Sequence, residues 1–506
     1  MKYSNIKLPP GVARSGTDGV VRDRWYDANF VRWRGPALLP IGNWETITPT
    51  ALGSVPRRIM SWVDLAGLRR TAILTDSAIW FLEGSAYTNA TPADYMAGQV
   101  DLTALGYGLG MYNKEAYGTE RTQGSKQIYV RPHSYSLDTF GQDMLTLDSS
   151  DGRLFTLAPR ASVLPPKAVV ATGAPISNVA MVVTEERHAM LFGASGNPRR
   201  IAWCSQGNYT DWDFASVTNT AGFLDIDTPG FILQAAKVRG GVLVFCDTEV
   251  WLMRYLGYPS VYGAERIGQA CSVIAPQAFA HMGGSCIWMG HSGFFMFKGG
   301  AVAALPCDIG DFIFAHIDRT AAPVRSHGGP NGVFPEAWFF YPSEGNTECN
   351  RYVMVNYEDR WWSMGEMSRS CWTEASVYPY PLGGSPTGFI HQHEMQWTGT
   401  NALREGMVYA ESAPISDPNS GSAVMHYLGG EFDSGHGYDA TRMYAYARDS
   451  RDGVETQYGP FTATADGLFD CRFSGRDVRL RIEATRGGEH WSIGELRLDA
   501  RKGGGR

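Results

Sequence analysis

Few side chains in this sequence have the type and spacing that chemistry requires. His391, His393 and Glu394 form the densest cluster of metal-ligand types. Residues two apart in a strand share one face, so the two histidines could ligate a single metal ion. No third ligand is identifiable, and paired histidines on a strand are more often ordinary polar residues. We therefore predict no metal and no other cofactor, and a metal at this histidine pair stays an open alternative.

The motifs of nucleotide-binding and hydrolytic enzymes are missing. The sequence contains no GxxxxGK[ST] loop, no GxGxxG after a strand, no GxSxG and no HExxH. Acidic residues are scattered through turns, where carboxylates commonly cap backbone N–H groups. A carboxylate pair for glycoside hydrolysis stays an alternative, because spacing in three dimensions cannot be read from a sequence. We predict that the chain is not an enzyme. These turn residues are Asp211, Asp213, Asp225, Asp227, Asp308 and Asp311.

Arginine and tryptophan are concentrated near the N-terminus. Guanidinium groups bind phosphate and stack on aromatic rings, and both residue types dominate interface hot spots. The simpler alternative is that arginine stems cover aromatic surface while their charged heads stay in water. We predict a protein–protein contact here in preference to a DNA contact. The candidate interface residues are Trp25, Tyr26, Arg32, Trp33, Arg34 and Trp44.

Short strands are the elements that must position these side chains. Six times along the chain, two runs of strand-forming residues flank a polar turn, a pattern typical of β-hairpins. Small sheets with two apolar faces can bury both by packing around an axis. We therefore predict an all-β fold with a β-propeller-like body of about six hairpin-based blades; a pair of β-sandwiches is the alternative. The hairpins span residues 71–83, 143–157, 188–204, 242–255, 285–298 and 351–364.

Three regions are predicted along the chain. Residues 1–50 form an extended N-terminal docking segment and the first strands. Residues 51–410 form the propeller-like body, interrupted near 84–135 by a long insertion that is polar and rich in glycine. Residues 411–506 start with a linker at 411–425 and continue as a C-terminal β-element that packs on or closes the body, because alternating runs recur there.

Composition and charge narrow the function. Charged residues make up 19% and aromatic residues 12% of the 506 residues, which suits many short strands joined by tight turns. The net charge of −7 argues against a protein that coats nucleic acid, because such proteins are usually basic. The eight cysteines form no CxxC pair and are interpreted as reduced core residues. No run has signal-peptide or transmembrane length, so we expect folding in a cytoplasm and no membrane-spanning segment.

Residues 24–47 contain an aromatic–x–Ala–Asn–x–x–Arg core, followed by Gly, Pro, Gly and Trp. With four further passages, in this order along the chain, they resemble the head-completion, packaged-DNA-stabilising and tail-hub (nozzle) proteins of short-tailed bacteriophages. The core positions are Tyr26, Ala28, Asn29, Arg32, Gly35, Pro40, Gly42 and Trp44, and the further passages are 199–214, 242–268, 285–300 and 475–506.

The resemblance implies a structural virion protein of the phage tail, made in the host bacterial cytoplasm. It implies a homo-oligomeric ring, a hexamer, that extends the DNA channel below the portal, retains the packaged genome and passes it during ejection. Implied partners are the portal adaptor and tail fibre or needle proteins, with transient non-specific contact to DNA. The alternative is a glycan-binding or glycan-cleaving β-propeller at a phage tail tip. A bacterial propeller that binds partner proteins is a third possibility.

Overall fold

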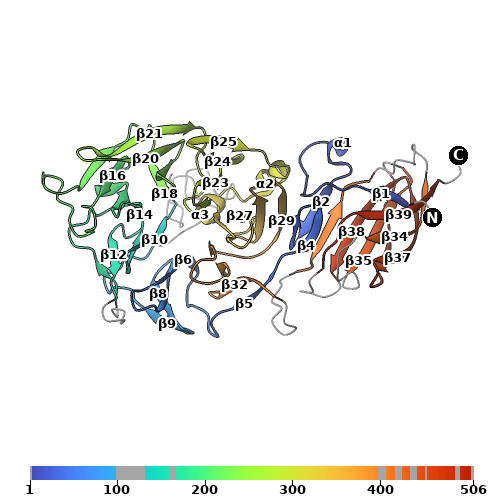
Figure 1. Cartoon of the computed structure of the whole chain (residues 1–506), viewed down its shortest axis with the longest axis horizontal. Helices are drawn as coiled ribbons and strands as arrows, with labels where there is room; N and C mark the ends of the chain where they lie inside the picture. The colour runs from blue at the N-terminus through green and yellow to red at the C-terminus, as the bar shows by residue number, and fades with distance from the viewer. Residues whose placement is uncertain are drawn as a thin grey trace, which may run out of the picture.

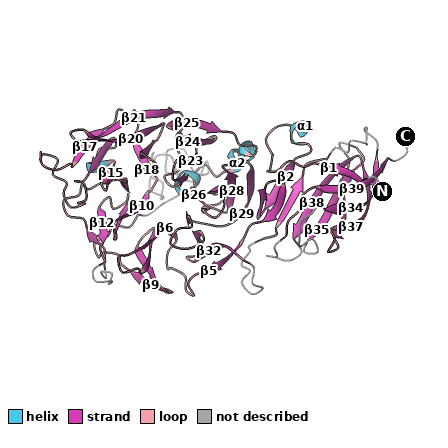
Figure 2. Cartoon of the chain, in the orientation of Figure 1, coloured by secondary structure: helices cyan, strands magenta, loops and turns pink. Residues whose placement is uncertain are grey.

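Antiparallel β-sheets make up nearly all of the structure. The computed structural model describes residues 3–98, 132–159, 167–396, 406–415, 424–432, 441–450, 453–484 and 491–502. The sheets gather into two bodies arranged along the long axis, and the few helices are short (Figures 1 and 2). No helix among the described residues is long and apolar enough to span a bilayer. The helical elements are α1 (Asp18–Val21), the 3₁₀ turn Ala194–Gly196, α2 (Gly310–His316) and α3 (Ala322–Arg325).

Seven four-stranded sheets, counted over the described residues, form the larger body. The innermost strand of each sheet contacts that of the next, and the seventh returns to the first, so the sheets close a ring around one axis. The predicted all-β, propeller-like fold is confirmed.

The blades follow the chain order. Blade 1 is β6 (Pro56–Val63), β7 (Arg69–Thr75), β8 (Ile79–Glu83) and β9 (Ala86–Asn89); blade 2 is β10 (Tyr135–Phe140), β11 (Asp143–Asp148), β12 (Leu154–Leu157) and β13 (Val169–Val170). Blade 3 is β14 (Ala180–Val183), β15 (Ala189–Phe192), β16 (Arg200–Trp203) and β17 (Gly222–Asp225); blade 4 is β18 (Ile232–Val238), β19 (Gly241–Cys246), β20 (Glu249–Gly257) and β21 (Val261–Gln269). Blade 5 is β22 (Phe279–Met282), β23 (Ser285–Met289), β24 (Phe294–Lys298) and β25 (Ala301–Leu305); blade 6 is β26 (His327–Pro330), β27 (Glu336–Tyr341), β28 (Arg351–Asn356) and β29 (Trp362–Glu366). Blade 7 is β30 (Cys371–Thr373), β31 (Leu382–Gly384), β32 (Ile390–Met395) and β5 (Asn43–Thr46).

The ring has one blade more than the six hairpins of the sequence. Each hairpin supplies two neighbouring strands to one of blades 1 to 6. Blade 7 gives no comparable signal because β30 and β31 have only three residues each. Its outermost strand, β5, comes from the N-terminal region, and the paired residues Thr46 and His391 are 345 positions apart. The N-terminal strand therefore closes the propeller ring.

The remaining long strands form a β-sandwich. Alternate side chains of β35 and β38 are buried, which is expected for strands that cover a core on one face only. Both sheets combine N-terminal with C-terminal strands. One sheet has the order β1 (Tyr3–Ile6), β39 (Leu496–Lys502), β34 (Met425–Phe432) and β37 (Leu468–Gly475). The other has the order β2 (Trp25–Asn29), β33 (Tyr409–Ser412), β38 (Asp477–Ala484), β35 (Thr441–Arg448) and β36 (Thr456–Thr462).

Two predicted segments fall largely outside the described residues. Of the insertion near 84–135, residues 99–131 are outside, and of the linker at 411–425, residues 416–423 are outside. The start of that linker, up to Ser412, belongs to β33.

The hairpin of β3 (Val31–Arg34) and β4 (Ala37–Pro40) lies between the two bodies (Figure 1). On the sandwich side, the backbones of Leu38 and Ile493 exchange hydrogen bonds of 2.8 and 3.0 Å. On the propeller side, Ser363 Oγ of blade 6 donates to the carbonyl of Val31 at 2.8 Å. One continuous cluster of buried apolar residues extends from blades 4 to 7 into both sandwich sheets. We call this region the seam.

Arg32 is the charged centre of the seam. Its guanidinium contacts Glu336 of blade 6 at 2.9 Å and Glu394 of blade 7 at 2.5 and 2.9 Å, and all three side chains are at most 6% exposed. Gly42 passes so close to Glu394 that a Cβ on it would lie 2.4 Å from the Glu394 Cα. The backbone N–H of Gly42 donates to the Glu394 carboxylate at 3.0 Å. These contacts give Arg32 and Gly42 a structural role in joining the two bodies.

Candidate binding site on the propeller axis

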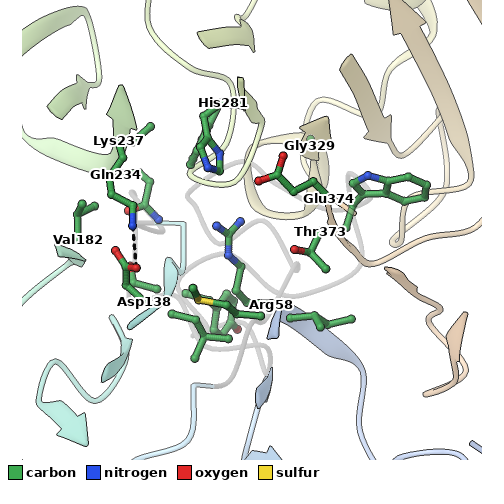
Figure 3. Close-up of a pocket in the computed structure, with 18 of the residues that line it drawn as sticks. Arg58, Asp138, Val182, Gln234, Lys237, His281, Gly329, Thr373 and Glu374 are labelled. Carbon is green, nitrogen blue, oxygen red and sulfur yellow. Dashed lines mark hydrogen bonds and ion pairs between the residues drawn. The ribbon is translucent and has the colours of Figure 1, made fainter. Parts of the chain in front are cut away.

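A cavity of about 220 Å³ lies on the axis of the propeller (Figure 3). Every second residue of an innermost strand faces the axis, so each blade contributes only a few lining side chains. Polar and charged groups from different blades meet there. Its lining includes Arg58 and Met60 from blade 1, Asp138 from blade 2, Val182 from blade 3, Gln234 and Lys237 from blade 4, His281 from blade 5, Gly329 from blade 6, and Thr373 and Glu374 from blade 7.

Arg58 places a guanidinium in the middle of this cavity, aimed toward His281 and Glu374 (Figure 3). Its Nη1 donates to Gln277 Oε1 at 2.9 Å, and no carboxylate of the described residues pairs with it. Burial lowers the pKa of Arg58, although an arginine starts so high that it stays charged at neutral pH. Arg58 is thus a desolvated cation with N–H donors left for a ligand.

Glu374 reaches the cavity from the side of blade 7, just after β30 (Figure 3). Among the described residues, no hydrogen-bond or ion-pair partner contacts its carboxyl. Burial raises the pKa of Glu374, because the charged form loses its hydration. This carboxyl therefore holds its proton to higher pH than an exposed glutamate does, and in that form it can donate a hydrogen bond.

His281 lies across the cavity from Glu374. Burial, together with the positive charges of Arg58 and Lys237, lowers the pKa of His281 to about 4. The imidazole is neutral at pH 7, and it can offer one donor and one acceptor to a ligand.

Asp138 is used by the fold. Its carboxylate pairs with Lys237 of blade 4 at 2.8 Å and accepts from the backbone N–H groups of Thr139 and Val183 at 2.9 and 2.8 Å. These contacts connect blade 2 with blades 3 and 4. Of the two carboxyl groups that line the cavity, that of Asp138 binds neighbouring blades, whereas that of Glu374 can bind a ligand.

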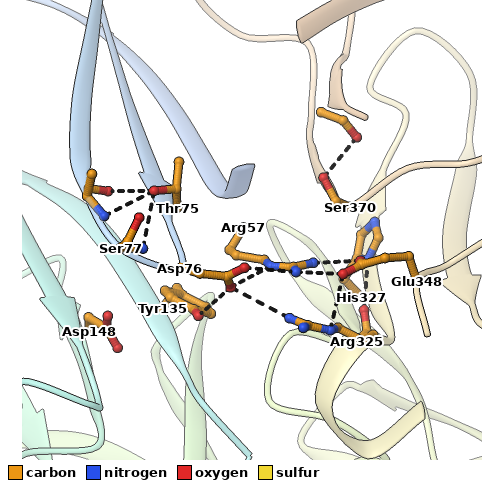
Figure 4. Close-up of polar contacts among 12 residues, drawn as sticks. Arg57, Thr75, Asp76, Ser77, Tyr135, Asp148, Arg325, His327, Glu348 and Ser370 are labelled. Carbon is orange, nitrogen blue, oxygen red and sulfur yellow. Dashed lines mark hydrogen bonds and ion pairs between the residues drawn. The ribbon is translucent and has the colours of Figure 1, made fainter. Parts of the chain in front are cut away.

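A network of ion pairs lies at the start of β6, next to the cavity-lining residue Arg58 (Figure 4). Arg57, at the start of β6, contacts Asp76 at 2.8 and 3.0 Å and Glu348 at 2.7 Å through two nitrogens. Arg325 approaches the same two carboxylates at 3.6 and 3.4 Å, and Tyr135 donates to Asp76 at 3.1 Å. The network ties blades 1, 2 and 6 together.

Gln277 separates this network from the cavity. It precedes blade 5, yet its Nε2 donates to the carbonyl of Tyr135 in blade 2 at 2.6 Å and its Oε1 accepts from Arg58 in blade 1. Because these blades face each other across the ring, the side chain crosses the axis. The cavity is therefore a pocket closed at this end, not an open channel.

The network predicts an acid-sensitive step in stability. Burial alone would raise the pKa of Asp76, but hydrogen bonds and charge from Arg57 and charge from Arg325 outweigh it and lower the pKa. A depressed folded-state pKa stabilises the fold above the unfolded value of about 3.9, and this contribution is lost as pH falls through the folded pKa. We expect Asp76→Asn to flatten the fall of the unfolding temperature between about pH 6 and about pH 3. Asp466→Asn, in an exposed turn, is the control, and equal pH profiles for both variants would contradict the assignment.

The structure corrects the partner interface predicted from the sequence. Trp25, Arg32, Trp33 and Trp44 are at most 6% exposed and pack in the seam. Propeller and sandwich of the same chain already cover them, so they cannot present a surface to another protein. Tyr26, which is half-buried, and Arg34, which is exposed, remain candidates for a partner contact.

The histidine pair of blade 7 also has intramolecular partners. His393 Nε2 accepts from Arg369 Nε at 2.9 Å, and His391 Nδ1 lies 3.2 Å from Thr46 Oγ1 of β5. Burial, and then the charge of Arg369, lowers the pKa of His391 to about 3. Glu394, next in sequence, is held by Arg32, and no group of three or more metal-ligand types converges in the described part of the chain. These side chains hold β5 and the seam in place.

Sequence reasoning missed the residues of the cavity. The signal for them in the sequence is weak: a charged residue or a histidine lies within a short strand that is mostly buried. Asp138 in β10, Lys237 in β18 and His281 in β22 follow this pattern. A charge inside a buried strand needs a partner or a water-filled cavity, so it marks positions near an axis or a site.

The fold and the cavity define a seven-bladed β-propeller with a polar pocket on its axis, joined to a β-sandwich. No protein-family model and no curated protein matches the chain.

Similar solved structures share the repeated sheets at low identity. The extracellular domain of a putative hybrid two-component system from B. thetaiotaomicron matches with a TM-score of 0.29 and 10% identity over 84% of this chain and 45% of that one, so this chain spans less than half of its length. An exo-β-1,3-galactanase from Phanerochaete chrysosporium has a TM-score of 0.23 and 11% identity over 97% and 99% of the two chains. A dihydro-heme d1 dehydrogenase has a TM-score of 0.35 and 12% identity over 86% and 79%.

One expectation is overturned by these similarities. The sequence analysis concluded that the chain is not an enzyme, but glycoside hydrolases are among the solved structures to which it is similar. The architecture therefore does not exclude catalysis, and that conclusion was wrong. At these TM-scores no residue of this chain is assigned a catalytic role by the similarity.

Proposed function

We propose that this chain is a glycan-binding β-propeller of a phage tail, and that the axial cavity holds one sugar unit of a bacterial surface glycan. The observation that carries the proposal is the polar axial pocket into which Arg58 and Glu374 project without ion-pair partners among the described residues. A concave site with a few convergent polar groups is the usual form of a small-ligand site. The phage setting rests on the resemblance of residues 24–47 and the further passages.

The lining supports a sugar as the ligand. The pocket is lined both by hydroxyl and amide side chains, among them Ser61, Thr373 and Gln234, and by apolar ones such as Met60 and Val182. A sugar ring has apolar C–H faces and hydroxyl edges, so it needs both kinds of contact at once. A cavity of about 220 Å³ has room for one such ring and little more.

The test is a substitution that fills the pocket with a large side chain and leaves its charged residues unchanged. Thr373 lines the cavity (Figure 3), and Thr373→Trp is expected to abolish binding of purified bacterial surface polysaccharides that the unaltered chain retains. Thr462→Trp, the same change on the exposed strand β36, is the control and should bind normally. Isothermal calorimetry and an immobilised glycan panel measure the effect. Binding that survives Thr373→Trp, or no binding to any glycan of the panel, would refute the proposal.

The same samples decide between binding and cleavage. Glycoside hydrolysis needs a carboxylic acid that can protonate the leaving oxygen, and a raised pKa suits that task. Glu374 is the side chain in the pocket with this property. If the chain releases new reducing ends, Glu374→Gln should stop the release while binding persists; release that continues would exclude Glu374 as the acid.

A second candidate function is the virion conduit, a ring of copies that retains and passes DNA. The observation in its favour is that Asn29, Arg32, Gly42 and Trp44, which carry the phage resemblance, are seam residues that hold the two bodies together. The axial pocket is closed, so DNA in such a ring would pass between subunits around a shared lumen and not through each propeller. Negative-stain images of the purified chain and mass spectrometry of virions test this: a stable monomer that is absent from virions would exclude it.

A further inference from the structure

We propose that the sugar unit bound in the axial cavity is an acidic one, and that Arg58 binds its carboxylate. This inference rests on the proposed glycan-binding function and specifies the ligand class of the same pocket. It follows from the balance of charges in the cavity.

Arg58 is the charge in the cavity that no described residue neutralises. Its hydrogen-bond partner is the neutral amide of Gln277. The carboxylate of Asp138 forms an ion pair with Lys237 and accepts hydrogen bonds from two backbone N–H groups. A desolvated guanidinium is costly without an anion, and a carboxylate offers two oxygens that match its planar fork. A ligand carboxylate would therefore supply the missing half of an ion pair.

The other groups around the pocket accept such an anion. Lys237 is balanced by Asp138, and His281 is neutral at pH 7 but able to donate a hydrogen bond. The raised pKa of Glu374 favours its protonated form, which can donate to a carboxylate or hydroxyl oxygen and does not repel an anion. Arg58 therefore stays the cation of the cavity that has no ion-pair partner among the described residues.

A carboxylate fits better than a phosphate group. Phosphate sites recruit several cations or a row of backbone N–H groups at a helix N-terminus. In the described residues the pocket offers one guanidinium without an ion-pair partner, and none of its lining residues lies in a helix. One guanidinium matches one monoanionic carboxylate, so a uronic-acid unit is the expected ligand class.

The experiment compares two forms of one sugar. Galacturonic-acid oligomers and their methyl esters have the same rings and nearly the same size, but only the free acids carry charge. We expect calorimetry to show binding of the free acids that is weakened on the order of 10- to 100-fold by Arg58→Gln, since a hydrogen-bonded ion pair is lost. Arg58→Lys, which keeps the charge without the fork, should fall in between. Arg199→Gln, an exposed arginine near blade 3, is the control and should bind as the unaltered chain does.

The possible outcomes separate this inference from the proposed function. Equal binding of acids and esters overturns the acidic ligand class but leaves a glycan-binding pocket. Binding of neither, together with no hit on the glycan panel, overturns both. Acid binding that Arg58→Gln leaves unchanged, in a variant whose unfolding temperature shows that it is folded, overturns the role of Arg58. A phosphorylated sugar that binds more tightly than the uronate overturns the carboxylate.

Discussion

Replacing Arg32 with Met is expected to lower the free energy of unfolding by about 3–5 kcal/mol, because it leaves two buried carboxylates without their cation. Glu336 and Glu394 both face this one guanidinium in the seam, and neither is more than 6% exposed. Their remaining hydrogen-bond donors are neutral: Asn331 Nδ2 at 3.2 and 2.9 Å, Trp338 Nε1 at 3.0 Å and the N–H of Gly42 at 3.0 Å. Urea unfolding followed by tryptophan fluorescence measures the loss.

Arg34→Met is a matched control for this prediction. Arg34 lies two residues further on the same strand, β3, but is exposed. A surface substitution of this kind is expected to change stability by no more than about 0.5 kcal/mol. Similar losses in both variants would show that the strand, and not the buried ion pair, determines the result.

The pH dependence of the Arg32→Met variant follows from the same charges. Arg32 holds the pKa of Glu394 down against burial, whereas burial, with the charge of Glu394, raises the pKa of Glu336. Without the arginine both folded-state pKa values should rise above the unfolded value of about 4.3, so the variant loses stability as pH rises through them. The deficit should be smaller near about pH 5 than near about pH 8.

Replacing Trp44 with Ala is expected to cost about 3–5 kcal/mol and to open the propeller at blade 7. Trp44 lies in β5 and is fully buried, with ring centroids 5.6 Å from Phe30 and 5.3 Å from His393, and Arg369 stacks on it at 4.9 Å. It anchors the strand that closes the ring. Hydrogen exchange should accelerate in β30–β32 before it does in the other blades.

Trp80→Ala provides the comparison for this second prediction. Trp80 lies in β8 of blade 1 and is half-buried, and its ring centroid is 6.5 Å from that of Tyr87. Its loss should weaken blade 1 locally and leave blade 7 protected. If Trp44→Ala accelerates exchange evenly around the ring, β5 is not the closing element that the strand order indicates.

The sequence predicted the parts of the fold that local patterns encode. A hairpin needs two apolar runs and a turn within about 15 residues, so blades 1 to 6 could be recognised one at a time. The pairing of β5 with β32 depends on contacts between distant residues, and no local pattern reports it. For the same reason no local pattern indicates that β1 and β2 join the C-terminal strands of the sandwich.

The candidate site was beyond the reach of sequence reasoning for a related reason. Each blade adds only a few residues to the axial cavity, and Arg58 and Glu374 are neighbours only once the ring has closed. The N-terminal arginine is a similar case, because Arg32 binds Glu394, 362 positions away in the same chain, and no local pattern indicates that partner.

Strand β5 imposes an order on the synthesis of this protein. The ribosome completes Thr46 long before His391, its partner, and at about 5–20 residues per second the 345 intervening residues take on the order of 20–70 s. Throughout that interval a tryptophan-rich nascent segment has no finished sheet to join. Chains that end before blade 7 should have an open ring with unpaired strand edges, which promote aggregation, so the ring can close only after β32 has been synthesised.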